Sequence, residues 1–208
     1  MRFDRAAWPF VGGALVLAGG ARLAGVRYVD GALLGAAAFL LFFFRDPERR
    51  PPEGDANVLS PADGRVLVAG DAQAGATPPG TWQQISIFLS PMDVHVNRIP
   101  VSGRVTRVAF TRGRFLPAYR HDAATANERS EIWIDHRGQT IVARQIVGAL
   151  ARRVVCRVEA GATVNAGDRF GIMKFGSRMD VFVPPGADLR VRVGDMVRGG
   201  ETVIAVLH

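Results

Sequence analysis

Gly161-Ala-Thr-Val-Asn-Ala-Gly-Asp168 recurs 33 residues later as Gly194-Asp-Met-Val-Arg-Gly-Gly-Glu201. Both copies fit the pattern G-x-x-V-x-x-G-[DE], and an apolar run follows each of them. Glycines on both sides of a short segment with a central valine are typical of a tight turn that leads into a strand. Because the chain contains 24 glycines, coincidental turn chemistry is the alternative explanation. The repeat favours a domain built from hairpins.

Short runs rich in Val, Ile and Phe surround the repeat, and Gly, Pro or Asp bounds them, which predicts strands. They are residues 65–68, 84–89, 103–110, 131–135, 139–145, 154–159, 169–174, 179–183, 188–193 and 202–207. Residues 147–153 are the best candidate for a short helix. The repeated turns resemble those of lipoyl and biotinyl carrier domains. The expected fold is mainly β (α+β), a β-rich sandwich or flattened barrel with carrier-like hairpins.

Two uncharged apolar runs, residues 6–21 and 31–44, precede this domain. Each is shorter than the ~20 residues that cross a bilayer core as a helix, although tilting could make up the difference. A buried pair of soluble helices is the alternative. The second run ends in FLLFFF at residues 39–44, and Arg45 follows at once, as expected where a membrane segment stops. We expect a membrane-associated helical hairpin over residues 1–46.

Arginines around the two runs predict an orientation. The outer flanks carry Arg2, Arg5, Arg45, Arg49 and Arg50, whereas the connecting turn carries Arg22 and Arg27. By the positive-inside rule, both ends of the hairpin face the cytoplasm. Residues 47–55, PERRPPEGD, are rich in Pro and charge, which indicates a linker. The second domain is therefore expected over residues 47–208, on the cytoplasmic side of the cell membrane.

The net charge of +7 comes almost entirely from arginine, because Lys174 is the only lysine. The arginines are scattered, which fits an anionic membrane surface better than nucleic acid, with ordinary solvated charge as the alternative. The single cysteine, Cys156, excludes an internal disulfide and a cysteine metal site. No spacing of histidines and carboxylates suggests a metal.

Four strings combine reactive side chains with turn residues: SPADG at 60–64, SPMDVHVNRIP at 90–100, NER at 127–129 and FGSR at 175–178. Ser177 does not lie in a G-x-S-x-G elbow followed by a helix, which argues against a conventional serine hydrolase. A serine preceded by glycine can instead direct its Oγ at its own upstream carbonyl, because Gly176 leaves room for tetrahedral geometry.

Six strings occur in order between about Leu40 and Val183: FRDPERRPP, SPADGRV, SPMDVHVNRIPVSGRV, NERS, ARQIVGALARR and FGSRMDVFVP. With them the chain resembles the phosphatidylserine decarboxylase family, in its short bacterial and archaeal type. The resemblance implies a proenzyme that cuts itself between Gly176 and Ser177 and converts Ser177 into a pyruvoyl cofactor. It also implies that fragments 1–176 and 177–208 stay associated and that membrane phosphatidylserine is the substrate. A homo-oligomer is left open.

A pyruvoyl group also suits this chemistry on physical grounds. Decarboxylation of an amino acid leaves a carbanion at Cα, and no ordinary side chain delocalises that charge, whereas a ketone bonded to an amide does. A pyridoxal enzyme would need a lysine, and Lys174 is the only one available. A competing reading is a non-enzymatic carrier modified at Lys174, since Ile172-Met173-Lys174 faintly echoes the Met-Lys-Met of biotinyl hairpins.

His95 and Asp63 are the remaining candidates for the site. Strand alternation would place Asp93, His95 and Asn97 on one face, with His95 as an acid or base near neutral pH. Asp63 lies in what could be a plain β-turn, and it resembles the family's carboxylate that orients and charges a base during self-cleavage.

The chain departs from the family pattern at Arg98, where larger members carry a second histidine. Either His95 serves both self-cleavage and substrate protonation, or Arg98 and Asn97 take a different part. His121 and His136 lie in loop-like surroundings, and we expect both to be solvated.

Overall fold

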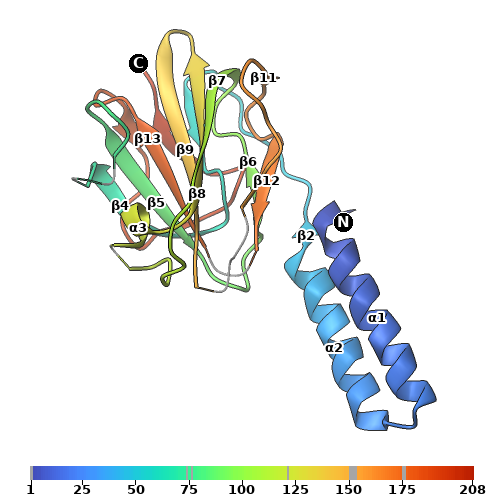
Figure 1. The fold of residues 1–208 in the computed structure, drawn as a ribbon. Coiled ribbons are helices and arrows are strands. Elements are labelled where there is room, and N and C mark those ends of the chain that lie inside the picture. Colours follow the sequence, from blue (N-terminus) through green and yellow to red (C-terminus); the bar gives the residue numbers. More distant parts are fainter. Residues whose placement is uncertain (1, 74, 76, 121, 150–153, 175–176) are drawn as a thin grey trace. The chain divides into compact units, whose positions relative to one another are not determined.

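The computed structural model describes residues 2–73, 75, 77–120, 122–149, 154–174 and 177–208. The chain forms two compact units, Met1–Glu48 and Arg49–His208, which are coloured blue and cyan to red in Figure 1. The first unit is a helical hairpin, and the second is built mainly from strands.

The hairpin consists of a short 3-10 helix, η1 (Arg5–Ala7), followed by α1 (Trp8–Leu23) and α2 (Arg27–Phe43). Strand β1 (Arg2–Phe3) pairs antiparallel with β2 (Arg45–Asp46), so the two ends of the hairpin meet. The segment Arg5–Leu23 is long and apolar enough to cross a membrane, and Tyr28–Phe43 is a shorter apolar helix.

Local chemistry explains the turn of the hairpin. Gly25 follows α1 with a φ of 76°, a left-handed conformation that favours glycine. Across the turn, the guanidinium of Arg22 lies 3.2 Å from the carboxylate of Asp30. Many large apolar side chains of the two helices are exposed within this unit: Trp8, Phe10, Leu15, Val16, Leu17, Leu23, Tyr28, Val29, Leu34, Phe39 and Phe42. An outer surface of this kind suits a lipid environment better than water.

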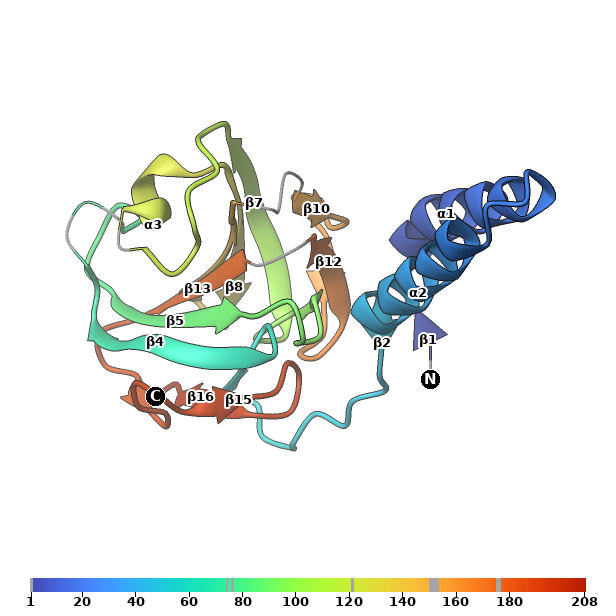
Figure 2. The same ribbon diagram turned by 90° about the horizontal axis from the view of Figure 1, so that it is seen from below.

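Within the described residues, the second unit contains one large and two small antiparallel sheets. The large sheet has the order β11 (Thr163–Val164), β7 (Gly103–Thr111), β8 (Arg129–His136), β9 (Gln139–Val147), β13 (Ser177–Val183), β5 (Gln83–Leu89), β4 (Gly64–Asp71) and β15 (Met196–Val197). The small sheets have the orders β10 (Val154–Cys156), β12 (Arg169–Met173), β6 (Val96–Arg98) and β14 (Asp188–Leu189), β16 (Val203–Val206), β3 (Asn57–Leu59). A one-turn helix, α3 (Ala123–Ala126), lies between β7 and β8 in the chain (Figure 2).

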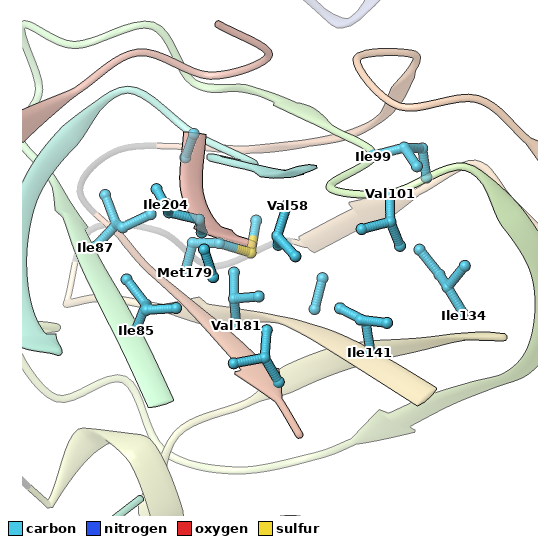
Figure 3. Packing of buried hydrophobic residues seen from close by; sticks show 14 of the residues in the cluster. Val58, Ile85, Ile87, Ile99, Val101, Ile134, Ile141, Met179, Val181 and Ile204 are labelled. Carbon is cyan, nitrogen blue, oxygen red and sulfur yellow. The ribbon is translucent and has the colours of Figure 1, made fainter. Parts of the chain in front are cut away.

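The hydrophobic core lies on one face of the large sheet. Met179 and Val181 of β13 point into it, among Ile85, Ile87 and Val58 (Figure 3). All of these side chains are fully buried. Because side chains alternate along a strand, Ser177 lies on the same face as Met179, next to this core.

The repeat found in the sequence is also a repeat in the structure. Its first copy supplies β11, which pairs with β7 at Gly103, and its second copy supplies β15, which pairs with β4 at Gly64. Equivalent backbone bonds recur, because Gly161 N–H donates to Val105 O and Gly194 N–H donates to Val66 O. The two copies therefore occupy equivalent positions at opposite edges of the large sheet, which favours a true repeat over a coincidence of turn chemistry.

The predicted mainly β domain with an N-terminal helical hairpin is confirmed. The predicted helix at 147–153 is wrong where it is described, because Val147 ends β9 and residues 148–149 are not helical. Residues 150–153 lie outside the described part of the chain. The likeness of individual hairpins to carrier domains stays a prediction.

Candidate active site

Ser177 is the first residue of β13, at one end of the large sheet. It is paired with Leu89 of β5 on one side and with Val147 of β9 on the other. Its side chain is fully buried, and among the described residues its Oγ has no hydrogen-bond partner. A buried hydroxyl left in this state costs about 1–3 kcal/mol, so it calls for a chemical explanation. Gly176, on the other side of the predicted cleavage bond, lies outside the described residues.

His95 is fully buried, just before β6. Its Nδ1 lies 3.0 Å from the carbonyl oxygen of Asp93. Because a carbonyl oxygen can only accept, Nδ1 donates this hydrogen bond. The bond fixes the orientation of the His95 ring.

Two connections bring His95 and Ser177 to the same end of the domain. On one side, Leu89 is paired with Ser177, and the turn over residues 90–95 leads from Leu89 to His95. On the other side, the N–H of Met173 donates to the carbonyl of His95 at 3.3 Å. Only residues 174–176 separate Met173 from Ser177, a span of at most about 14 Å for an extended chain.

Asp63 is held by both of its carboxylate oxygens. Its Oδ2 accepts a hydrogen bond from Arg49 at 2.6 Å, and its Oδ1 accepts one from the N–H of Gly199 at 2.7 Å. Arg49 also donates to Glu201 at 2.9 Å. Burial raises the pKa of Asp63 above its ordinary value, and the charge of nearby Asp93 adds to the rise, although Gly199 and Arg49 oppose it.

Comparison of the two repeated turns distinguishes the two contacts of the Asp63 carboxylate. Strand β7 pairs with the first copy as β4 pairs with the second, and the residue before β7 that corresponds to Asp63 is Ser102. The Oγ of Ser102 accepts a hydrogen bond from Ala166 N–H at 3.0 Å. Ala166 is the repeat equivalent of Gly199, so the bond to Oδ1 belongs to the repeated turn. The carboxylate charge and its pairing with Arg49 have no counterpart at Ser102.

The prediction that Asp93, His95 and Asn97 share a strand face is wrong. Strand β6 begins only at Val96, and Asp93 lies in a turn where its Oδ2 accepts a hydrogen bond from Ser90 N–H at 2.7 Å. The local carboxylate forms this turn because it satisfies a backbone N–H within three residues. Asp93 thus shapes the approach to His95.

The structure also shows where His136 and Arg98 lie. His136 is buried rather than solvated, because its Nδ1 lies 2.6 Å from Ser102 O. His121 lies outside the described residues. The guanidinium of Arg98, which replaces the second histidine, donates to Gly167 O at 3.0 Å in the first turn of the repeat.

Sequence reasoning missed two polar groups near Ser177. On the core side, Gln145 donates to Asn97 at 2.8 Å, and both amides are fully buried. On the opposite side of β13, the buried guanidinium of Arg178 lies 2.6 Å from the carboxylate of Asp180. Gln145 could have been noticed as a polar residue within the mostly apolar run Ile141–Val147. For Arg178, nothing in the sequence of β13 indicates that the second face of this strand is covered.

The arrangement brings a buried serine hydroxyl, without a hydrogen-bond partner among the described residues, and a buried histidine to one end of a β domain. These are the groups that an enzyme needs to activate a serine side chain. Comparison with known proteins then identifies the family. Residues 36–205 match the family model described as phosphatidylserine decarboxylase.

Curated relatives agree with this match. The chain is 42% identical over 195 residues to the phosphatidylserine decarboxylase proenzyme of Chlorobium limicola, covering 92% of each chain. It is 45% identical over 174 residues to the proenzyme of Salinibacter ruber, covering 82% of this chain and 77% of the relative. It is 44% identical over 189 residues to the proenzyme of Gluconobacter oxydans, covering 87% of this chain and 82% of the relative. The chain belongs to the phosphatidylserine decarboxylase family.

Proposed function

We propose that this protein decarboxylates phosphatidylserine to phosphatidylethanolamine and CO2, with a pyruvoyl group that it makes from Ser177. The family membership supports the reaction and the proenzyme state. The observation that carries the assignment to Ser177 is its fully buried Oγ, which has no hydrogen-bond partner among the described residues. Such a hydroxyl is available to react, because no donor or acceptor has to be displaced from it.

Maturation begins when the Oγ of Ser177 attacks the carbonyl carbon of Gly176. The peptide C–N bond breaks as an ester to Oγ forms, and the nitrogen takes up the proton. Loss of the Cα proton of Ser177 then expels the carboxylate of Gly176, and hydrolysis of the remaining enamine releases ammonia and leaves a ketone. The resulting pyruvoyl group accepts the electrons that are released when CO2 leaves the substrate.

His95 is the proposed acid and base in both stages. Since Nδ1 donates to Asp93 O, Nε2 is the ring nitrogen that would take a proton from Ser177 Oγ during maturation. In the mature enzyme, the protonated Nε2 returns a proton to the substrate carbon after CO2 has left. Burial of His95 keeps water from competing in either transfer.

Asp63 is proposed to favour the charged state of His95 during maturation. It lies close enough to Asp93 for the two charges to affect each other, and the ring of His95 bonds the Asp93 carbonyl. A carboxylate in this neighbourhood stabilises an imidazolium. The pairing of Asp63 with Arg49 fixes where that charge lies.

The two fragments of the mature enzyme, residues 1–176 and 177–208, are proposed to stay associated. Strand β13 belongs to the small fragment, and it is paired along its length between β5 and β9 of the large one. The Asp63–Gly199 bond and the Arg49–Glu201 ion pair also join the two fragments. Removing β13 would expose two strand edges and the core, which strongly opposes separation.

The helical hairpin is proposed to hold the enzyme at the cell membrane, with the β domain on the cytoplasmic side. The apolar exposed surface of α1 and α2 supports insertion, and the excess of arginines on the outer flanks supports the orientation. A diacyl substrate stays in the bilayer, so attachment brings the site to it.

Mass spectrometry under denaturing conditions tests the proposal. The expressed protein should give two chains, residues 1–176 and 177–208, the second carrying a ketone at its start and resisting Edman degradation. Ser177→Ala should remain one chain and release no labelled CO2 from phosphatidylserine. An Ala variant that is still cut at this bond would overturn the assignment, and a single chain with an adduct on Lys174 would support a carrier instead.

A further inference from the structure

The segment of residues 110–120, FTRGRFLPAYR, combines exposed aromatic and basic side chains. The exposed fractions are 57% for Phe110, 39% for Phe115 and 65% for Tyr119. Arg112 and Arg114 lie between the first two aromatics, and both are exposed. Large aromatic side chains presented to water need a reason, because burying each of them elsewhere would be favourable.

The arginines of this segment are available to bind anions. Among the described residues, neither Arg112 nor Arg114 has a carboxylate partner, whereas Arg120 is paired with Asp122 at 2.9 Å. The segment itself contains no acidic residue. Unpaired arginine next to exposed phenylalanine and tyrosine is the composition that favours the interface of an anionic bilayer.

The segment is held rigidly by the domain. The side-chain amide of Asn127 accepts a hydrogen bond from Leu116 N–H at 2.9 Å and donates to Leu116 O at 2.8 Å. Arg114 is bound through its backbone, since its N–H donates to Ala126 O at 2.7 Å. Gly113 is required there, because a Cβ would lie 2.5 Å from Ala126 O. The exposed side chains therefore stand on a loop whose backbone is hydrogen-bonded to the rest of the domain.

The same contacts place the segment at the end of the sheet where Ser177 lies. Asn127 also donates to Val147 O at 2.8 Å, and Val147 is paired with Ser177. Tyr119 packs edge-on against Phe88, with ring centroids 6.2 Å apart. Figure 1 shows α3, which closes this loop, at the lower end of the large sheet.

A cavity of about 180 Å³ adjoins the segment. Arg65, Phe88, Ser90, Asp93 and Met196 line it. Phe88 links the cavity to Tyr119, and the Ser90–Asp93 turn links it to His95. The cavity therefore borders Tyr119 through Phe88 and borders the turn that leads to His95 through Ser90 and Asp93.

We propose that the 110–120 segment is a membrane-docking surface of the β domain, which binds an anionic phospholipid bilayer and presents lipid substrate at the end of the sheet where Ser177 lies. This surface is separate from the helical hairpin, and its role in substrate delivery rests on the proposed function. The hairpin keeps the protein on the membrane, whereas the segment turns the active-site end of the domain toward the lipid headgroups. Positive charge and aromatic rings match the anionic headgroups and the interfacial region of that partner.

A probe at residue 115 tests the contact in the full-length protein. Cys156→Ser removes the native thiol, and Phe115→Cys then carries an environment-sensitive fluorophore in nanodiscs that contain phosphatidylserine and spin-labelled lipid. The matched control is Arg137→Cys, at the exposed turn between β8 and β9, the other end of those strands. Quenching at residue 115 but not at 137 is expected. Equal quenching at residues 115 and 137, or no quenching at residue 115, would overturn the proposal. It would also be overturned if, in detergent without lipid, a second copy of the protein shielded the fluorophore at residue 115 from solvent.

Kinetics test the delivery step. Arg112→Glu with Arg114→Glu should lower kcat/KM on phosphatidylserine vesicles by about five-fold per arginine at low salt, and high salt should narrow the gap. Activity on short-chain, water-soluble phosphatidylserine should be unchanged. The control, Arg104→Glu with Arg137→Glu, makes the same charge change at the far end of β7 and β8 and should retain vesicle activity.

The outcomes separate this proposal from the proposed function. An equal loss on vesicles and on soluble substrate would overturn docking, because it would mean that the site itself is damaged. If the unmodified protein turned over neither substrate, the proposed function would fail, whereas the quenching result would still decide whether the segment meets the bilayer.

Discussion

The two carboxylate oxygens of Asp63 have different partners, and the repeat explains why. The hydrogen bond from Gly199 N–H to Oδ1 holds the second repeated turn, and Ser102 makes the equivalent bond to the first repeated turn. The ion pair of Oδ2 with Arg49 has no equivalent at Ser102. Substitution can therefore separate the structural contribution of Asp63 from its charge.

We expect Asp63→Asn and Asp63→Ser to slow self-cleavage to a similar extent, since both remove the charge and keep an acceptor for Gly199. Turnover by the fraction that matures should change little, because the mature enzyme has no serine hydroxyl left to activate. Time courses of cleavage and of labelled CO2 release measure the two effects. Normal maturation of both variants, with failure only of Asp63→Ala, would mean that Asp63 serves the turn alone.

The raised pKa of Asp63 gives opposite pH trends for stability and cleavage. Its folded pKa lies above its unfolded value, so its contribution to stability is present below the ordinary aspartate pKa and is lost as pH rises through the raised one. Over the same window the carboxylate becomes charged, so cleavage should rise with pH. Denaturant unfolding of Ser177→Ala, with and without Asp63→Ser, measures the first trend, and cleavage rates measure the second. Matching pH profiles with and without Asp63→Ser would contradict both expectations.

His95→Ala should slow the cut before Ser177 and also reduce turnover in whatever fraction matures. The expected loss in each step is about 100- to 10,000-fold, the usual range for general acid or base assistance. An hours-long cleavage time course and CO2 release from the separated mature fraction measure it. If this variant matures and decarboxylates at the original rate, His95 is structural, and Arg98 or Asn97 is the next residue to test.

At the scale of elements, the repeated turns depend on glycines that admit a neighbouring strand. A Cβ on Gly64 would lie 2.2 Å from Phe88 O, and one on Gly103 would lie 2.2 Å from Asp135 O. Gly64 also has a φ of 152°. These glycines begin β4 and β7, so they set how both edge hairpins join the large sheet.

Gly64→Ala should therefore destabilise the β domain by several kcal/mol, a large effect for a single methyl group, because the backbone has to move. Gly186→Ala is the matched control, since nothing lies within 4 Å of its Cβ position. Denaturant midpoints of the two variants in the Ser177→Ala background provide the measurement. Similar midpoints would show that the sheet edge tolerates the displacement.

Both faces of β13 are buried, although charged residues alternate with apolar ones in its first half. Arg178 and Asp180 are both buried. Arg178 also donates a 2.9 Å hydrogen bond to Ser86 Oγ. Period-two patterning indicates which residues share a face, but it does not say whether another part of the chain packs on that face. The loop that carries Tyr119 reaches the same strand pair at Phe88.

At the scale of the whole molecule, the two units should separate in function. Deletion of residues 1–44 should release the remainder into the soluble fraction at moderate salt with self-cleavage intact, since Arg49–His208 forms a compact unit of its own. Salt alone should not release the full-length protein, because screening leaves hydrophobic insertion in place. Fractionation followed by mass analysis checks both expectations. Complete extraction by high salt would mean that the apolar helices are packed within protein.

Local signals in the sequence were enough to predict the apolar hairpin, the longer strands and the repeated glycine turns. The sequence also identified the family, because six ordered strings span most of the chain. Such features depend on residues that are close in sequence, where periodicity and turn chemistry act directly.

The tertiary structure was needed to show which distant groups meet. It joined Asp63 to Gly199, buried His136 against Ser102, set Gln145 against Asn97, and held residues 110–120 beside the active-site end of the sheet through Asn127. The physical reason is that a strand pattern states what each face requires, whereas its partner is chosen by the packing of the whole sheet. The free energy of that packing depends on contacts between residues far apart in the chain.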